Sequence, residues 1–322
     1  MKAIVCKKYG SPEVLELTEV EKPTPYDHQV LVKIHASSVN YGNLVLMKGE
    51  PFLARFAFGL FTPKYSIPGG DIAGRVEAVG KEVKQFQPGD EVFGDLASCG
   101  WGGFAEYVSV PESALALKPA NISFEEAASV PMAGVTALQA LRGKGKIMPG
   151  QKVLIHGASG GVGTFAVQIA KALGAEVTGV CSTSNLEILQ SLGADHLIDY
   201  KKEDFTQTGQ RYDLILGVNG NQPISAYKRS LNPNGTFVHV GGSETQMFQA
   251  MIKGPWISMT GNKKISTFLQ RPNQKDLKDI KELIEARKVK PVIDRSYTLD
   301  EIREAFKYFG EGHARGKVVI TI

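Results

Sequence analysis

The segment from His156 to Gly163 reads His-Gly-Ala-Ser-Gly-Gly-Val-Gly and is the clearest chemical motif of the sequence. Gly160 and Gly161 let the main chain approach a pyrophosphate, and Gly163 lets the next helix pack close to the preceding strand. Free N–H groups at the start of that helix attract phosphate oxygens. The alternative is a glycine-rich turn of another α/β protein, because Ala158 replaces the first glycine of the usual pattern. We favour a dinucleotide site with contacts at Ser159, Gly160, Gly161 and Val162.

The end of the strand that follows this motif, 176–181, bears on which dinucleotide binds. NAD-preferring sites usually carry Asp or Glu there, which accepts a hydrogen bond from the ribose 2′-OH. Residues 181–185 read Cys-Ser-Thr-Ser-Asn and hold no acid, while Tyr200 and Lys201 follow the third strand. Small hydroxyls and an amide leave room and donors for a 2′-phosphate, although no Arg or Lys lies in this stretch. We therefore expect NADP(H), with contacts at Ser182, Thr183, Asn185 and Tyr200.

The elements that must position this site alternate between strand and helix. The apolar, β-branched run 151–155, the helical apolar spacing of 164–173 and the short run 176–181 predict a strand, a helix and a strand around the glycine turn. The pattern continues to about residue 262 and predicts a doubly wound sheet of six strands. These strands are 151–155, 176–181, 196–199, 212–216, 235–240 and 256–260, and the later helices are 188–192, 223–231 and 245–252.

The first 120 residues predict a separate, β-rich domain. Short apolar runs divided by Gly and Pro turns indicate a partly closed antiparallel barrel. Ser123-Phe-Glu-Glu126 matches a capping box that opens a helix, and Pro131 should kink or break that helix. After a helix over 276–288 and another over 300–309, we expect the last strand, 317–322, to return to the barrel.

Composition limits the class of protein. A chain of 322 residues can hold two cores, and 43% hydrophobic and 22% charged residues are usual for a globular protein. A net charge of +4 without a dense basic cluster argues against nucleic acid. The three cysteines are scattered, which favours a reducing compartment. The most lipophilic stretch, 52–61, has ten residues including Arg55 and cannot span a bilayer, so we expect a cytoplasmic protein.

Several short motifs, in order along the chain, carry a family resemblance. They are Ser38–Asn40, Pro68–Val76, Pro88–Val92, Gly103–Tyr107, Ala133–Leu138, Ala158–Gly163, Leu192–Asp195 and Gly312–Lys317. Together they resemble the medium-chain dehydrogenase/reductase superfamily, in particular its zinc-free quinone oxidoreductase branch, which includes chloroplast-envelope and reticulon-interacting mitochondrial homologues. The resemblance implies an α/β fold in which a GroES-like β-barrel catalytic domain accompanies a Rossmann doubly wound parallel sheet. The implied segments are 1–122 (catalytic), 123–288 (NADP-binding) and 289–322 (return to the catalytic domain).

No zinc site is expected. Zinc alcohol dehydrogenases of this superfamily take ligands from a Cys and from a Gly-His-Glu run. The corresponding stretches here read Ser-Ser-Val-Asn at 37–40 and Gly-Gly-Asp at 69–71, and Cys99 stands alone. Zinc needs three or four N, S or O ligands in one place, and the six histidines are spread along the chain.

Without zinc, the resemblance implies reduction of an activated C=C bond, as in an enone or alkenal, or of a quinone. Hydride added to the β-carbon of an enone leaves an enolate, which needs hydrogen-bond donors and a proton. The alternatives are a zinc-independent alcohol dehydrogenase, an enoyl-thioester reductase and a non-catalytic scaffold that binds NADPH. Turnover would distinguish a scaffold from the enzymes.

The resemblance also assigns site residues. Asn40 matches an asparagine that lines the substrate pocket, and three residues later Asn43 replaces the usual Asp. Tyr41 replaces the usual Pro and becomes a candidate proton donor. Alternatively, Asn40 and Asn43 only satisfy a turn. Asp71 stands where zinc enzymes place Glu, with either a capping or a pocket role.

On the cofactor side, the matching positions near the nicotinamide and its ribose are Thr136, Asn219, Val240, Gly241 and Gly242. Arg315 and Lys317 either reach phosphate or substrate, or form a solvated surface pair. The implied catalytic residues are Asn40, Tyr41 and Asn43, and Arg315 joins the cofactor contacts.

Two apolar segments suggest partners. Phe52–Phe61 holds four phenylalanines and two leucines, which predicts a mobile flap for a bulky hydrophobic carbonyl or quinone substrate; a dimer contact or a packed loop are the alternatives. Family members often dimerise through the edge strand of the cofactor sheet, and 256–260 is apolar enough to be that edge. We expect a homodimer that binds no nucleic acid and has no membrane span.

Overall fold

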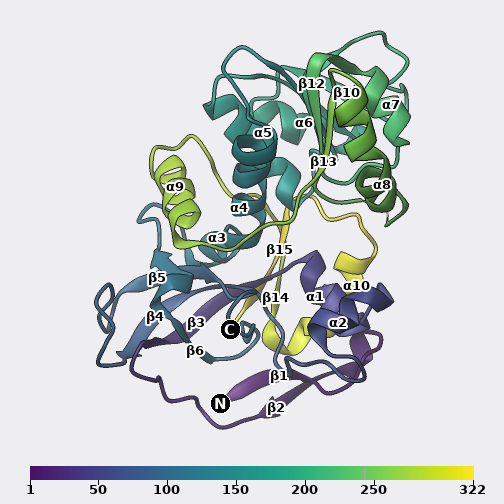
Figure 1. The fold of residues 1–322 in the computed structure, drawn as a ribbon. Coiled ribbons are helices and arrows are strands. Elements are labelled where there is room, and N and C mark those ends of the chain that lie inside the picture. The colour runs from purple at the N-terminus through teal and green to yellow at the C-terminus, as the bar shows by residue number, and fades with distance from the viewer. Residues whose placement is uncertain (243) are drawn as a thin grey trace. The chain divides into compact units, whose positions relative to one another are not determined.

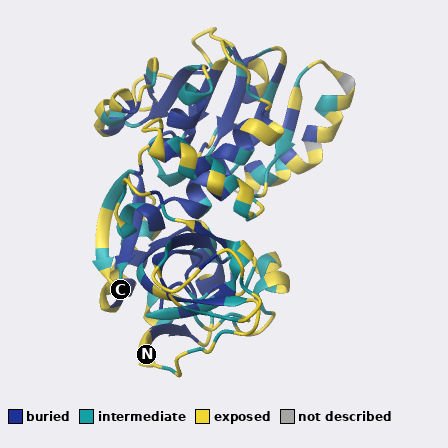
Figure 2. Cartoon of the chain, turned by 90° about the vertical axis from the view of Figure 1, so that its left-hand side faces the viewer, coloured by how far each residue is buried: buried dark blue, intermediate teal, exposed yellow. Residues whose placement is uncertain are grey.

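The computed structural model describes residues 1–242 and 244–322, which form two compact units. The first unit comprises Met1–Ala133, Arg271–Glu285 and Pro291–Ile322, and the second comprises Gly134–Gln270 and Ala286–Lys290. The strands of each unit are mostly buried, dark blue in Figure 2, whereas loops and outer helix faces are exposed. The three-segment division expected from the sequence stays a prediction.

The first unit is organised around one long strand, β3 (Gln29–Val39) (Figure 1). This strand pairs antiparallel with three others, β4 (Asp71–Val79), β6 (Tyr107–Pro111) and β15 (Lys317–Thr321). Its last residues lie opposite both the start of β4 and the start of β15. The remaining strands are β1 (Lys2–Cys6), β2 (Leu15–Glu19), β5 (Glu91–Asp95), β7 (Leu115–Leu117) and β14 (Ile293–Thr298).

Two consecutive helices of the first unit begin at residues that the sequence analysis marked. Ser123 accepts from the N–H of Glu126 and opens the short helix α3 (Phe124–Ala128). This helix ends before Pro131, as expected, and Pro131 begins a new helix, α4 (Pro131–Gln139). The last strand, β15, pairs with β3, so the C-terminus returns to the sheet built by the N-terminal segment, as expected. The helices are α1 (Tyr41–Lys48), α2 (Arg55–Phe58), α3 (Phe124–Ala128), α4 (Pro131–Gln139), which continues into the second unit, α9 (Gln274–Glu285) and α10 (Ile302–Gly310).

Within the described residues, the second unit holds a parallel sheet of six strands in the order β10-β9-β8-β11-β12-β13. This order is that of a doubly wound dinucleotide-binding sheet and confirms the predicted fold class. The strands are β8 (Lys152–His156), β9 (Glu176–Cys181), β10 (His196–Asp199), β11 (Tyr212–Gly217), β12 (Leu231–His239) and β13 (Lys264–Thr267). The helices are α5 (Gly161–Ala172), α6 (Leu186–Ser191), α7 (Ile224–Arg229) and α8 (Glu244–Thr260).

One predicted strand is wrong. Residues 256–260 form the last part of α8, and the edge strand is β13 instead. Pro255, a residue that usually breaks a helix, lies inside α8. Phe248, Ile252, Trp256 and Met259 recur at helical spacing and are all exposed, so the apolar run is one face of a helix.

Among the described residues, no helix is both long and apolar enough to cross a membrane.

Candidate active site

The glycine turn joins the end of β8 to the start of α5. Gly157 has a φ of +87°, and Gly160 is the N-cap of the helix. A Cβ at Gly163 would lie 2.2 Å from the carbonyl oxygen of Gly157, so only glycine fits there. A Cβ at Gly160 would meet nothing closer than 3.8 Å. The turn is therefore tightly packed at Gly163 but open at Gly160. The methyl group of Ala158 is fully buried within the unit.

Polar side chains at the end of β9 gather beside this turn. The amide Nδ2 of Asn185 donates to Ser159 Oγ at 3.0 Å and to Ser182 Oγ at 3.2 Å. The structure therefore brings together three of the predicted contacts. Tyr200 is exposed, and its backbone N–H donates to the carbonyl of Cys181.

An acid that the sequence interpretation did not place here lies beside the same strand end. Asp199, in register with Cys181, accepts from Thr183 Oγ1 at 2.5 Å and from the N–H of Lys201 at 3.0 Å. The hydrogen bond from Thr183 lowers the pKa of this carboxyl. The hydroxyl of Thr183 thus donates to Asp199, just as the amide of Asn185 donates to Ser159 and Ser182.

The other predicted cofactor contacts of the second unit lie at the carboxyl edge of its sheet. Asn219 donates its N–H to the carbonyl of His156, while Val240 and Gly241 donate theirs to Gly217. Asn219 follows β11, and Val240 and Gly241 follow β12, at the edge where doubly wound sheets bind their ligands. Thr136 lies in α4 and is buried. Arg315 belongs to the first unit, where its N–H donates to Asp294 Oδ2.

The sequence interpretation missed a buried pair under the turn. His156 Nδ1 lies 2.8 Å from the hydroxyl of Tyr227. Burial lowers the pKa of His156 to about 4 and raises that of Tyr227 to about 12, so both groups are neutral near pH 7. A Cβ at Gly220 would come within 2.1 Å of the tyrosine oxygen. The pair therefore fixes the strand end that carries the turn.

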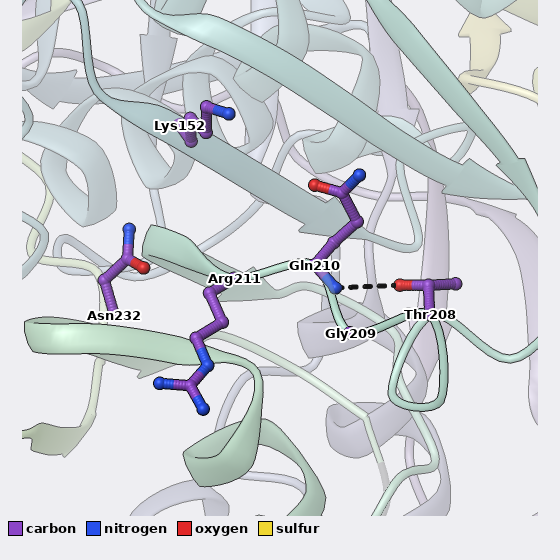
Figure 3. A pocket seen from close by; sticks show the side chains of 6 residues that line it. All are labelled: Lys152, Thr208, Gly209, Gln210, Arg211 and Asn232. Carbon is purple, nitrogen blue, oxygen red and sulfur yellow. Dashed lines mark hydrogen bonds between the residues drawn. The ribbon is translucent and has the colours of Figure 1, made fainter.

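A shallow pocket of about 540 Å³ lies elsewhere on the second unit. Figure 3 shows its lining residues: Lys152, Thr208, Gly209, Gln210, Arg211 and Asn232. Lys152 begins β8 and Arg211 precedes β11, so this pocket lies at the amino edge of the sheet, opposite the glycine turn. It is therefore not the cofactor site.

In the first unit, three polar side chains form a buried network around Asp71. Lys317 Nζ donates to Asn40 Oδ1 at 2.5 Å, and Asn40 Nδ2 donates to Asp71 Oδ2 at 2.8 Å. Ser38 Oγ also donates to Asp71 Oδ2, at 2.7 Å. The sheet register brings them together, because Ser38 faces Asp71 across β3 and β4, while Val39 faces Val318 across β3 and β15.

Lys317 is buried, which excludes the solvated surface pair. Its Nζ has three acceptors, Asn40 Oδ1, Asp71 Oδ2 at 3.4 Å and the Val39 carbonyl at 3.5 Å. Three acceptors match the three N–H bonds of an ammonium. Burial lowers the pKa of Lys317, and the Asp71 carboxylate acts in the opposite direction. We conclude that Lys317 and Asp71 form a buried ion pair.

Asp71 also acts as a helix cap. Its second oxygen, Oδ1, accepts from the N–H of Met132 at 2.8 Å, in the first turn of α4. One carboxylate thus ties the sheet to the start of this helix.

The three predicted catalytic residues differ in their surroundings. Asn43 Oδ1 accepts from the N–H of Asn40 at 2.7 Å and closes the first turn of α1. Both asparagines are buried, whereas Tyr41 is 62% exposed. Asn43 Nδ2 is a buried donor without a partner in the described part of the chain. The structure brings Asn40 and Asn43 together, and leaves Tyr41 accessible.

Comparison with known proteins identifies the family. Residues 26–120 match the model of the alcohol dehydrogenase GroES-like domain, and residues 192–320 match that of the zinc-binding dehydrogenases. The chain belongs to the medium-chain dehydrogenase/reductase superfamily and to its quinone oxidoreductase branch. It is an oxidoreductase of that family.

Particular relatives cover nearly the whole chain. The chloroplast envelope quinone oxidoreductase homologue of Arabidopsis thaliana is 34% identical, over 99% of this chain and 98% of its own. The 2-methylene-furan-3-one reductase of Solanum lycopersicum is 36% identical, over 99% and 79%. The solved structure of the quinone oxidoreductase from Coxiella burnetii is 32% identical, with a TM-score of 0.88 over 100% and 99%.

Replacing Gly163 by Ala should destabilise the second unit by about 1–3 kcal/mol, because the added methyl group overlaps the main chain of Gly157. Gly160→Ala is the matched control, since its methyl group would enter open space; its loss should stay below about 1 kcal/mol. Urea unfolding measures both. Equal losses for the two variants would contradict the packing described for this turn.

Replacing Lys317 by Met should lower the free energy of unfolding by about 3–5 kcal/mol, because Asp71 would stay buried without its cation. Lys317→Met combined with Asp71→Asn should recover part of this loss. Lys307→Met is the control: it breaks a pair with Glu13 whose side chains are 52% and 58% exposed, and should change stability by less than about 1 kcal/mol. A loss for Lys317→Met no larger than for the control would contradict the ion pair.

Proposed function

We propose that the chain is an NADPH-dependent, zinc-independent oxidoreductase that reduces an activated C=C bond or a quinone. The observation that carries the proposal is the buried network of Lys317, Asn40 and Asp71 in the unit that matches the GroES-like domain. It supplies a fixed positive charge and oriented donors without a metal ion. The quinone and furanone reductases among the relatives support the same reaction class.

The donors around Asp71 do not fit zinc. Both oxygens of this carboxylate already accept hydrogen bonds, from Ser38 and Asn40 on one side and from the N–H of Met132 on the other. A lysine ammonium lies 3.4 Å away and would repel a second cation. Within residues 1–242 and 244–322, no group of three His, Cys, Asp or Glu side chains is arranged to hold a metal.

The second unit fits a nicotinamide dinucleotide. The open main chain at Gly160 and the first turn of α5 would hold the pyrophosphate. Asn219, Val240 and Gly241 would line the nicotinamide side, and Ser182, Asn185 and Tyr200 would receive a 2′-phosphate. When bound, the nicotinamide supplies the hydride. We infer NADP(H) because hydroxyl and amide donors replace the usual acid at the end of β9.

The first unit would bind and polarise the substrate oxygen. One N–H of Asn40 Nδ2 points to Asp71, but its other contact, with the Ser38 carbonyl, is long at 3.4 Å. That N–H is the one that a substrate oxygen would take over. The ammonium of Lys317 polarises the same amide and strengthens its donor. Negative charge that develops on the substrate oxygen is thereby stabilised.

Tyr41 would deliver the proton. Its side chain directly follows Asn40 and is accessible, and a phenol next to the bound oxygen can protonate an enolate or a reduced quinone. The buried amide of Asn43 holds the turn that carries Tyr41.

Loss of NADPH absorbance should be fast with an enone, an alkenal or a benzoquinone, and slow with a simple ketone or an enoyl thioester. NADPH should bind more tightly than NADH, and Gly160→Ala should weaken NADPH binding without unfolding the chain. Tight NADPH binding without turnover of any acceptor would show that the chain is a binding protein and not an enzyme. Tighter NADH binding would overturn the cofactor preference alone.

In the same assay, Tyr41→Phe should reduce turnover of the best acceptor by about 10²-fold, the usual contribution of a positioned acid. Tyr26→Phe, at another exposed tyrosine of the same unit, should leave turnover unchanged. Unchanged turnover for Tyr41→Phe would assign the proton to another donor or to water.

We also propose that the chain forms a homodimer through β13 and α8. β13 is the edge of the sheet, and an unpaired edge needs protection. Helix α8, which contacts β13, exposes Phe248, Met251, Ile252, Trp256 and Met259. A second copy that paired with β13 would cover this face.

Sedimentation velocity should give a dimer for the wild-type chain and a monomer for Trp256→Glu, because a charge at the centre of the apolar face opposes association. Phe61→Glu, in the other unit, is the control and should leave the dimer intact. A wild-type monomer at micromolar concentration would overturn the proposal.

A further inference from the structure

A group of exposed apolar side chains in the first unit lies in residues 52–61, the segment predicted as a flap. Five side chains of this segment are exposed: Phe52 (60%), Leu53 (62%), Phe56 (71%), Leu60 (41%) and Phe61 (85%). We call these five side chains the aromatic platform. Soluble proteins rarely expose so many large apolar groups together, and such patches usually meet a partner.

The platform stands on an anchored turn. Helix α2 carries Phe58 on its inner side, where the ring packs edge-to-face on Trp101 at 6.0 Å. Tyr9 OH donates to the Gly59 carbonyl at 2.5 Å, and Arg55 Nε donates to the Gly49 carbonyl at 3.0 Å. The segment therefore uses some of its apolar and polar groups to hold itself on the unit, and turns the five platform side chains outward.

Cations lie in the segments that flank and anchor the platform. Lys7 and Lys8 directly precede Tyr9, Lys48 directly precedes Gly49, and the N–H of Lys64 donates to the carbonyl of Phe58. All four lysines are exposed. From Lys48 to Lys64 the sequence has one acid, Glu50. The apolar side chains are thus framed by an excess of positive charge.

The combination of exposed apolar side chains and lysines favours one kind of binding partner over others. In a two-fold dimer the same patch of both copies forms the interface, so a second copy would bring two sets of these cations into one contact. A small ligand needs a concave site that buries it, whereas these side chains are mostly exposed. A bilayer with anionic headgroups accepts both parts, since apolar side chains enter the headgroup region and lysines meet the negative surface.

We propose that the aromatic platform docks the protein on the surface of a membrane that contains anionic phospholipid. The inference is independent of the proposed reaction, and it requires no membrane-spanning segment. It also differs from the dimer face on α8, which belongs to the second unit.

Co-sedimentation of the full chain with vesicles tests this surface. The wild-type protein should bind vesicles of phosphatidylcholine with phosphatidylserine, and bind vesicles of phosphatidylcholine alone much more weakly. Added salt should release it, because the attraction of lysines to the surface is screened. Phe56→Glu combined with Phe61→Glu should reduce binding to the mixed vesicles at least about tenfold, since two carboxylates would have to enter the headgroup region.

Tyr26→Glu is the matched control, because it places one acid at an aromatic side chain that is 73% exposed outside the platform; its vesicle binding should stay close to that of the wild type. Thermal melting verifies that all variants fold, as none of these side chains is buried. Wild-type protein that stays in the supernatant with both kinds of vesicle would overturn the proposal. So would a dimer that dissociates in the Phe56→Glu/Phe61→Glu variant, which would assign the platform to a second copy.

Discussion

The buried ion pair between Lys317 and Asp71 is the interaction on which the first unit depends. Charges removed from water are stable only when every donor and acceptor around them is satisfied. Here that requirement fixes the ends of β3, β4 and β15 and the start of α4 through Ser38, Asn40 and Met132. The same requirement orients the amide that faces the proposed substrate. Stability and chemistry are thus met by one set of hydrogen bonds.

In the second unit, the requirement is that the main chain of the glycine turn is open to a ligand and still held in one conformation. Its glycine turn combines an open position at Gly160 with a crowded one at Gly163. The neutral pair of His156 and Tyr227 lies beneath it. Burial keeps both groups uncharged near pH 7, so the pair fixes the strand end without adding a charge where phosphates would bind.

The sequence was most informative where local rules decide structure. The capping box at Ser123, the break at Pro131 and the alternation around β8 and α5 all follow from neighbouring residues. The strand expected at 256–260 failed because five apolar residues fit a strand or a helix face equally well, and only the longer spacing from Phe248 separates them. The site of the first unit could not be assembled in this way. Asn40 and Lys317 are 277 residues apart, and their contact depends on strand register, which a hydrophobic pattern leaves open.

The cap that Asp71 places on α4 has a consequence for protein engineering. The boundary between the two units falls inside this helix, between Ala133 and Gly134. A chimera that joins this barrel to another nucleotide-binding unit should therefore be spliced after Met132, so that the carboxylate keeps its partner. A junction placed earlier would replace the start of α4 but keep Asp71. The hydrogen bond from the N–H of Met132 to Asp71 would then depend on the new sequence.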